Sequence, residues 1–261
     1  MSSAKKGRKI GAVIFLTLIG LSLILLIILY APIFNISAIT VSGSTKYSAE
    51  EIKQRSGLVP GENGFRKLKL TPESILELRL VDSETKINQL PYIKSSRVRL
   101  RFPDRVEITV TERKAEAFIK YLDSYLIVDR EGFVLEVMAE RPEKIYKEIK
   151  GIEFAKYSIG GQLEAQDIGI VKLAVSIIDA IKSSDSNDTF KLYDVMDWVD
   201  IIDSNNAMLS LDGRILVQFN PAAKLQYTID FTKEIFFKKL NSKETGRILF
   251  PEGQNPNFIP E

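Results

Sequence analysis

Hydrophobic residues run without a charge from residue 10 to residue 30, in the stretch IGAVIFLTLIGLSLILLIILY. At 1.5 Å per residue, a helix of this length spans about 30 Å, which is the thickness of a hydrocarbon core. No face of the segment is polar, so a helix buried in a globular core explains it less well than a membrane span. The pattern therefore predicts a transmembrane helix over residues 10–30, preceded by a short tail of residues 1–9.

Basic residues flank this segment on one side only. Lys5, Lys6, Arg8 and Lys9 precede it, and no Lys or Arg follows until Lys46. The positive-inside rule then keeps the N-terminus in the cytoplasm and makes these four cations the topology determinants. The alternative is a cleavable signal peptide, with a shorter apolar region and an A-x-A-like site. The exit reads LYAPIFN, without such a site, which favours an uncleaved anchor.

Apolar and polar residues alternate strictly in LPYIKSSRVRLRFPDRVEITVTER, residues 90–113. Alternation of period two is typical of half-buried strands, so the stretch predicts a hairpin around Pro-Asp. Both apolar sets occupy even positions, which indicates a three-residue loop, Pro103-Asp104-Arg105. In that register the facing pairs are Phe102 and Val106, Leu100 and Ile108, Val98 and Val110, and Arg101 and Glu107. The arginines at 97, 99 and 101 predict a solvated sheet face, with a docking patch as the alternative.

Further elements complete the first module. Residues 34–41, FNISAITV, predict a strand. Ser48 and Glu51 form a capping box, which predicts a helix that ends near Gly57. Thr71-Pro72 opens a second helix, with Thr as N-cap. The order strand–helix–helix–strand–strand indicates an α+β fold.

The second module is predicted to be mixed α/β with antiparallel hairpins, followed by a tail over residues 251–261. One hairpin surrounds the Asp-Arg-Glu-Gly turn at 129–132, and another surrounds Asp212-Gly213. The predicted strands are 125–128, 133–137, 198–202, 207–211, 214–219 and 247–250, and the predicted helices are 165–183 and 225–240.

Composition restricts the chemistry. The chain has no Cys and no His, so thiolate and imidazole sites are excluded. Beyond residue 30 the chain carries 32 basic and 34 acidic residues, which is no footprint for nucleic acid. Carboxylates are the densest remaining candidates, at Asp129, Glu131 and the aspartates of 194–203. The run 194–212 lacks the spacing of an EF-hand, and Asp129 precedes a glycine as turn aspartates do. We expect no catalytic residue, metal or cofactor.

Several motifs together resemble one protein family. FNISAITVSG, SAEEI, LPYI and the hairpin closing on Glu112-Arg113 resemble the POTRA module of the FtsQ/DivIB bacterial cell-division family. The VD..G hairpin resembles that of the family's second domain. The resemblance implies a cytoplasmic tail (1–9), a transmembrane helix (10–30), a POTRA domain (34–112), a β-domain (113–250) and a C-terminal tail (251–261). Two features depart from the family pattern, and both lie in loops. The family often has Asn at the position of Ser44, and it often has a Pro soon after Glu-Arg, which this sequence lacks.

The resemblance also implies a function. Such a protein would be a non-catalytic, single-pass type II scaffold of the divisome, located in the cell membrane at the septum. It would recruit FtsL-like and FtsB/DivIC-like proteins and link them to the septal peptidoglycan synthase complex. The family's C-terminal strands carry the partner-binding surface, which by position would include Arg247, Ile248, Leu249, Phe250, Phe258 and Ile259.

Other interpretations remain open at this point. Ile248 and Phe250 could simply point into the core of the β-domain. A membrane-anchored cell-wall enzyme with a carboxylate pair is the alternative function. A POTRA-bearing protein of outer-membrane export would need a long series of barrel strands, for which this chain is too short.

Overall fold

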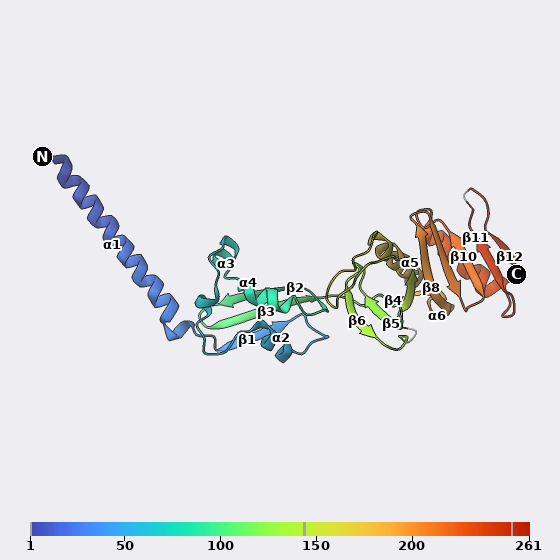
Figure 1. The fold of residues 1–261 in the computed structure, drawn as a ribbon, viewed down its shortest axis with the longest axis horizontal. Coiled ribbons are helices and arrows are strands. Elements are labelled where there is room, and N and C mark those ends of the chain that lie inside the picture. Colours follow the sequence, from blue (N-terminus) through green and yellow to red (C-terminus); the bar gives the residue numbers. More distant parts are fainter. Residues whose placement is uncertain (1, 143–144, 252) are drawn as a thin grey trace. The chain divides into compact units, whose positions relative to one another are not determined.

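The computed structural model describes residues 2–142, 145–251 and 253–261. The chain divides into two compact units, Met1–Glu112 and Arg113–Glu261 (Figure 1). The first unit begins with helix α1, Ser2–Tyr30. Within it, Gly11–Tyr30 is long and apolar enough to cross a membrane, and none of its most apolar window is buried in the protein.

The rest of the first unit is a three-stranded sheet covered by helices. Its order is β1-β3-β2, with β1 parallel and β2 antiparallel to β3. The elements are η1 (Pro32–Phe34), β1 (Ala38–Ser42), α2 (Ala49–Ser56), η2 (Gly64–Lys67), α3 (Pro72–Glu77), α4 (Val81–Ile87), β2 (Ile93–Arg101) and β3 (Arg105–Glu112). The predicted α+β class is confirmed, because the buried face of the hairpin packs with Ile52 and Ile87 of the helices.

The ends of α2 and the start of α3 lie where the predicted capping residues put them. The Ser48 hydroxyl accepts a hydrogen bond from the Glu51 N–H, and the Glu51 side chain accepts one from the Ser48 N–H, as the capping box predicts. Gly57 ends α2 in the left-handed region at φ 69°. Thr71 caps α3 by accepting from the Ser74 N–H. The second predicted helix is nevertheless interrupted, because Leu78 is left-handed and a separate helix, α4, follows.

The predicted hairpin register was wrong by two residues. Leu100 faces Val106 and Val98 faces Ile108, so Arg105 belongs to β3 and the turn is Phe102-Pro103-Asp104. A slip of two residues keeps the same side chains on the buried face, and alternation alone cannot detect it. Phe102 leaves the sheet and contacts Phe34 and Phe65 instead. The first strand also begins later than predicted, at Ala38, because residues 32–34 form a 3-10 turn.

The second unit is built on a nine-stranded sheet of order β12-β11-β10-β9-β8-β7-β4-β5-β6 (Figure 1). The strands are β4 (Ala117–Tyr121), β5 (Ser124–Val128), β6 (Val134–Met138), β7 (Lys147–Lys150), β8 (Met196–Asp203), β9 (Asn206–Leu211), β10 (Ile215–Phe219), β11 (Gly246–Leu249) and β12 (Asn257–Pro260). The helices are α5 (Gly169–Asp185), α6 (Leu192–Val195) and α7 (Leu225–Glu234). The predicted hairpins at 129–132 and 212–213 are both present.

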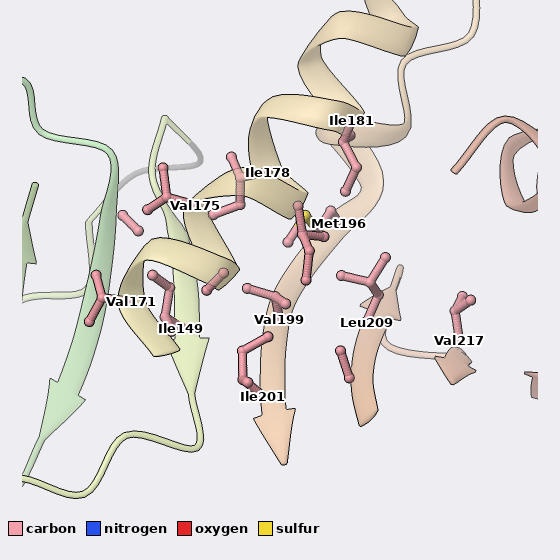
Figure 2. Close-up of a cluster of buried hydrophobic side chains, with 14 of the residues drawn as sticks. Ile149, Val171, Val175, Ile178, Ile181, Met196, Val199, Ile201, Leu209 and Val217 are labelled. Carbon is pink, nitrogen blue, oxygen red and sulfur yellow. The ribbon is translucent and has the colours of Figure 1, made fainter. Parts of the chain in front are cut away.

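The core of this unit lies between the sheet and α5. Figure 2 shows side chains of α5, among them Val175 and Ile178, over strands that carry Ile149, Val199 and Leu209. These residues are fully or almost fully buried. Helix α5 follows β7 and α7 follows β10, so each helix leads the chain back to a strand that runs parallel to the one before it.

Three strands of the second unit, β4, β7 and β12, were not predicted. β7 reads KEIK, and its buried Lys147 satisfies its ammonium by donating to the Met196 carbonyl at 2.6 Å. β12 lies within the predicted tail, so residues 257–260 are part of the sheet. The predicted helix 225–240 is regular only to Glu234 and continues as a π-turn over Ile235–Lys239.

Candidate partner-binding edge

The sheet of the second unit ends at β12. β11 pairs in parallel with β10 on one side and antiparallel with β12 on the other. Among the described residues, no strand pairs with the outer side of β12. An unpaired strand edge presents N–H and C=O groups to which another chain can add a strand.

The direction of each backbone group follows from the register. The N–H groups of Gly246 and Phe250 donate to Arg214 and Gln218 in the β10 direction, at 3.1 and 3.0 Å. The Glu261 N–H donates to the Thr245 carbonyl at 3.0 Å, so the odd-numbered residues of β11 face β12. Arg247 faces Ile259, and therefore the polar groups of Ile259 point towards β11.

The outer edge of β12 consequently consists of groups from Phe258 and Pro260. Proline has no N–H, so this stretch offers one outward donor, the Phe258 N–H, and two outward acceptors, the carbonyls of Phe258 and Pro260. A partner strand that pairs here is restricted to the register in which its own carbonyl meets the Phe258 N–H.

The structure brings the six predicted partner-binding residues together on two paired strands and the residue after β11. Ile248 is fully buried, and Phe250 and Phe258 pack against the same core. Arg247 and Ile259 are the exposed members, and Ile259 is 46% exposed. Arg247 Nε lies 3.1 Å from Glu261 Oε1 in a solvent-exposed ion pair. The side chains of Ile248, Phe250 and Phe258 therefore belong to the core, and those of Arg247 and Ile259 face solvent. Because β11 is paired on both sides, the unpaired backbone groups among these described residues are those on the outer side of β12.

Gly246 makes the close approach of β12 possible, a feature that the sequence interpretation missed. Its φ is +151°, and a Cβ at this position would lie 2.2 Å from the Ile259 carbonyl oxygen. Only glycine fits beside β12 here. The signal in the sequence is a pair of short segments: GRIL, which begins with Gly246, and NFIP, which follows Pro256 and ends with Pro260.

Two carboxylates that a cell-wall enzyme could have used, Asp129 and Asp197, instead accept hydrogen bonds that stabilise turns. Asp129 Oδ1 accepts hydrogen bonds from the N–H groups of Glu131 and Phe133, each at 2.9 Å. Asp129 Oδ2 pairs with Arg113 at 2.6 Å. Asp197 likewise accepts from Ser210 Oγ and the Gly213 N–H. Across residues 2–142, 145–251 and 253–261, no group of three or more metal-ligating side chains is present.

The four predicted topology determinants, Lys5, Lys6, Arg8 and Lys9, lie in the N-terminal part of α1. Their backbone continues the helix that contains the apolar segment. Their side chains lie outside the described part of the structure.

Comparison with known proteins shows which proteins the chain resembles. Residues 34–113 match the family described as POTRA domain, FtsQ-type. Cell division protein DivIB of Clostridium botulinum (strain Hall) is 27% identical over 197 residues, which are 76% of this chain and 73% of that protein. Cell division protein FtsQ of Corynebacterium glutamicum is 26% identical over 187 residues, 71% of each chain. Cell division protein DivIB of Bacillus subtilis (strain 168) is 27% identical over 121 residues, 46% of this chain and 42% of that protein.

These relatives are all named as cell-division proteins, and they support a division role for this chain. The apolar N-terminal helix and the relatives together support a membrane-anchored protein. Residues 34–113 therefore carry an FtsQ-type POTRA domain, and most of the chain is similar to proteins named as DivIB and FtsQ cell-division proteins.

Proposed function

We propose that this protein is a non-catalytic scaffold of the divisome. It recruits FtsL-like and FtsB/DivIC-like division proteins and links them to the septal peptidoglycan synthase complex. The observation that carries the proposal is the open edge of β12 at the end of a nine-stranded sheet. The structural use of Asp129 and Asp197 supports a scaffold over an enzyme with a carboxylate pair.

The proposed mechanism is addition of a partner strand to the outer edge of β12. The Phe258 N–H and the carbonyls of Phe258 and Pro260 form the backbone contacts, while the exposed Ile259 supplies an apolar contact. Arg247 adds a charge that is held at the surface by Glu261. Confinement of all partners to one membrane raises their effective concentration, so a short paired segment suffices.

The proposal includes the orientation of the chain. The cations Lys5, Lys6, Arg8 and Lys9 keep residues 1–9 in the cytoplasm, and the POTRA domain (34–112), the β-domain (113–250) and the C-terminal residues 251–261 lie outside. The protein is then a single-pass type II membrane protein at the septum. Only the extracytoplasmic side of the membrane gives the edge of β12 access to the extracytoplasmic segments of its partners.

Binding to the cognate FtsL–FtsB/DivIC pair tests the proposed edge. The full chain in lipid nanodiscs would be compared with Ile259→Asp and with a matched control, Ile202→Asp. Ile202 is 51% exposed, close to the 46% of Ile259, but lies on β8. We expect Ile259→Asp to weaken binding about tenfold or more, equivalent to about 1.4 kcal/mol, and the control to bind like the native chain.

A variant that ends at Pro251 lacks β12. It therefore distinguishes partner binding at the edge of β12 from partner binding at β11. Loss of binding, with the fold retained by circular dichroism, supports pairing with β12. Retained binding would move the site to β11, with the partner in the place of β12. Equal effects of the two isoleucine substitutions would overturn the proposed edge.

A further inference from the structure

Three phenylalanines from separate segments meet at one end of the first unit. They are Phe34 of η1, Phe65 of η2 and Phe102 of the turn between β2 and β3. The ring centroids of Phe34 and Phe65 are 5.1 Å apart, and those of Phe65 and Phe102 are 5.5 Å apart. Despite these contacts Phe102 is 64% exposed, and Ile33 beside Phe34 is 63% exposed. We call Ile33, Phe34, Phe65 and Phe102 the aromatic platform.

The chain itself keeps this platform close to the membrane. Phe34 follows Tyr30, the last residue of the apolar helix, by four positions, so the two lie within about 14 Å of each other. The Asn63 side-chain amide donates to the carbonyls of Ile28 and Ala31, at 3.1 and 3.3 Å. These bonds satisfy carbonyls at the C-terminal end of α1 and tie the start of η2 to it.

Cations lie next to the platform. The Arg66 guanidinium lies 5.5 Å from the centre of the Tyr30 ring, and Arg66 itself is exposed. Arg105, also exposed, follows the Phe102 turn and lines the same small hollow as Phe34 and Phe65. Exposed aromatic rings with adjacent cations are the side chains that favour the boundary between acyl chains and phosphates.

We propose that the aromatic platform is immersed in the interfacial layer of the leaflet from which α1 emerges. Phe102 and Ile33 contact the upper acyl chains, and Arg66 and Arg105 meet lipid phosphates. The bilayer is the occupant because the platform is continuous with the membrane span and is reached within four residues of its end. The inference is independent of the C-terminal edge, since every residue involved belongs to the first unit.

Lipid quenching of a tryptophan tests this placement. The single Trp198 would be replaced by Phe, and Phe102→Trp would be introduced into the full chain in nanodiscs that contain spin-labelled lipids. The control is Ser95→Trp, an exposed position about 23 Å further along β2. We expect the reporter at 102 to lose most of its emission to lipids labelled near the headgroup, and the reporter at 95 to keep it. Equal quenching at 102 and 95 would overturn the proposal.

Because tryptophan itself favours the interface, a second reporter is needed. Phe65→Trp would be measured with and without Phe102→Asp, after circular dichroism has shown that both proteins fold. We expect Phe102→Asp to reduce the lipid quenching at position 65. No change on adding Phe102→Asp would overturn the proposal. So would a reporter that is shielded from iodide in water but unquenched by labelled lipid, because a protein would then cover the platform.

Discussion

Arg113 Nη1 lies 2.6 Å from Asp129 Oδ2, and each side chain is less than a tenth exposed. The Arg113 guanidinium also stacks over the Phe133 ring, with Cζ 3.4 Å from its centre. Arg113 is the first residue of the second unit, and Asp129 opens the turn between β5 and β6. The ion pair therefore connects the first residue of the second unit to the hairpin of β5 and β6, and β6 is one edge of the sheet.

Replacement of Asp129 by Ala should destabilise the second unit by about 3 kcal/mol, because it leaves the buried guanidinium with the half-exposed Glu131 as its remaining ion-pair partner among the described residues. Chemical denaturation followed through Trp198 fluorescence measures the change. Asp123→Ala, in the exposed turn between β4 and β5, is the control and should change stability by about 0.5 kcal/mol or less. Similar losses in the two variants would show that the buried pair contributes little.

The capping box of α2 gives a second prediction. Ser48→Ala removes the acceptor for the Glu51 N–H and should cost about 1 kcal/mol of stability in the first unit. Ser95→Ala removes a hydroxyl from an exposed position on β2 and should be close to neutral. Hydrogen exchange of residues 49–52 in the full chain measures the difference. Unchanged exchange in Ser48→Ala would contradict the capping role.

Glu112 gives a pH-dependent prediction. Burial raises the pKa of its carboxyl, but hydrogen bonds from Thr45, the Lys46 N–H and Ser44 outweigh burial and lower the pKa to about 2. A carboxylate with a lower pKa in the folded than in the unfolded state stabilises the fold above its unfolded value of about 4.5, and this contribution is lost as pH falls towards about 2.

We therefore expect the amides of Thr45 and Lys46, which donate to Glu112 at 2.9 and 2.8 Å, to lose protection over that range. Hydrogen exchange, corrected for intrinsic rates, measures this loss. Glu112→Gln removes the charge and should abolish the pH dependence. Protection of these two amides that stays constant with pH in the native chain would refute the assignment.

The close contact between Gly246 and β12 predicts that a larger side chain at position 246 would detach β12 from β11. Gly246→Ala places a methyl group where the Ile259 carbonyl lies, 2.2 Å away, so β12 should separate while β4–β10 remain folded. Loss of exchange protection at Ile259 would show the separation. The control is Gly253→Ala, because no atom lies within 4 Å of that Cβ and only the φ of +70° is unfavourable. Full protection of Ile259 in Gly246→Ala would contradict the close approach.

Local rules predicted those elements whose cause is local. The hydroxyl of Ser48, the left-handed Gly57 and the Asp212-Gly213 turn each act within a few residues, and the sequence reveals them. The register of the hairpin at Phe102 depends on Phe34 and Phe65, which lie 68 and 37 positions earlier, so alternation could not determine it.

The candidate edge also depends on contacts between residues that are distant in the sequence. The family resemblance pointed to residues 247–250 and to 258–259, and the structure pairs these segments as β11 and β12. The four residues of β12 have no strand pattern of their own, because Pro260 is among them. They are extended because they pair with β11, and β11 in turn pairs with β10.

The order of the sheet has a consequence for how the chain is made. From β8 to β12, each strand lies next to the strand that precedes it in the sequence. During synthesis, every new strand therefore finds its neighbour already in place, and the sheet lengthens in one direction as residues are added. β12 is added after β11 in this order and, among the described residues, has no strand on its outer side, so the proposed partner strand would take the next position in the same direction of growth.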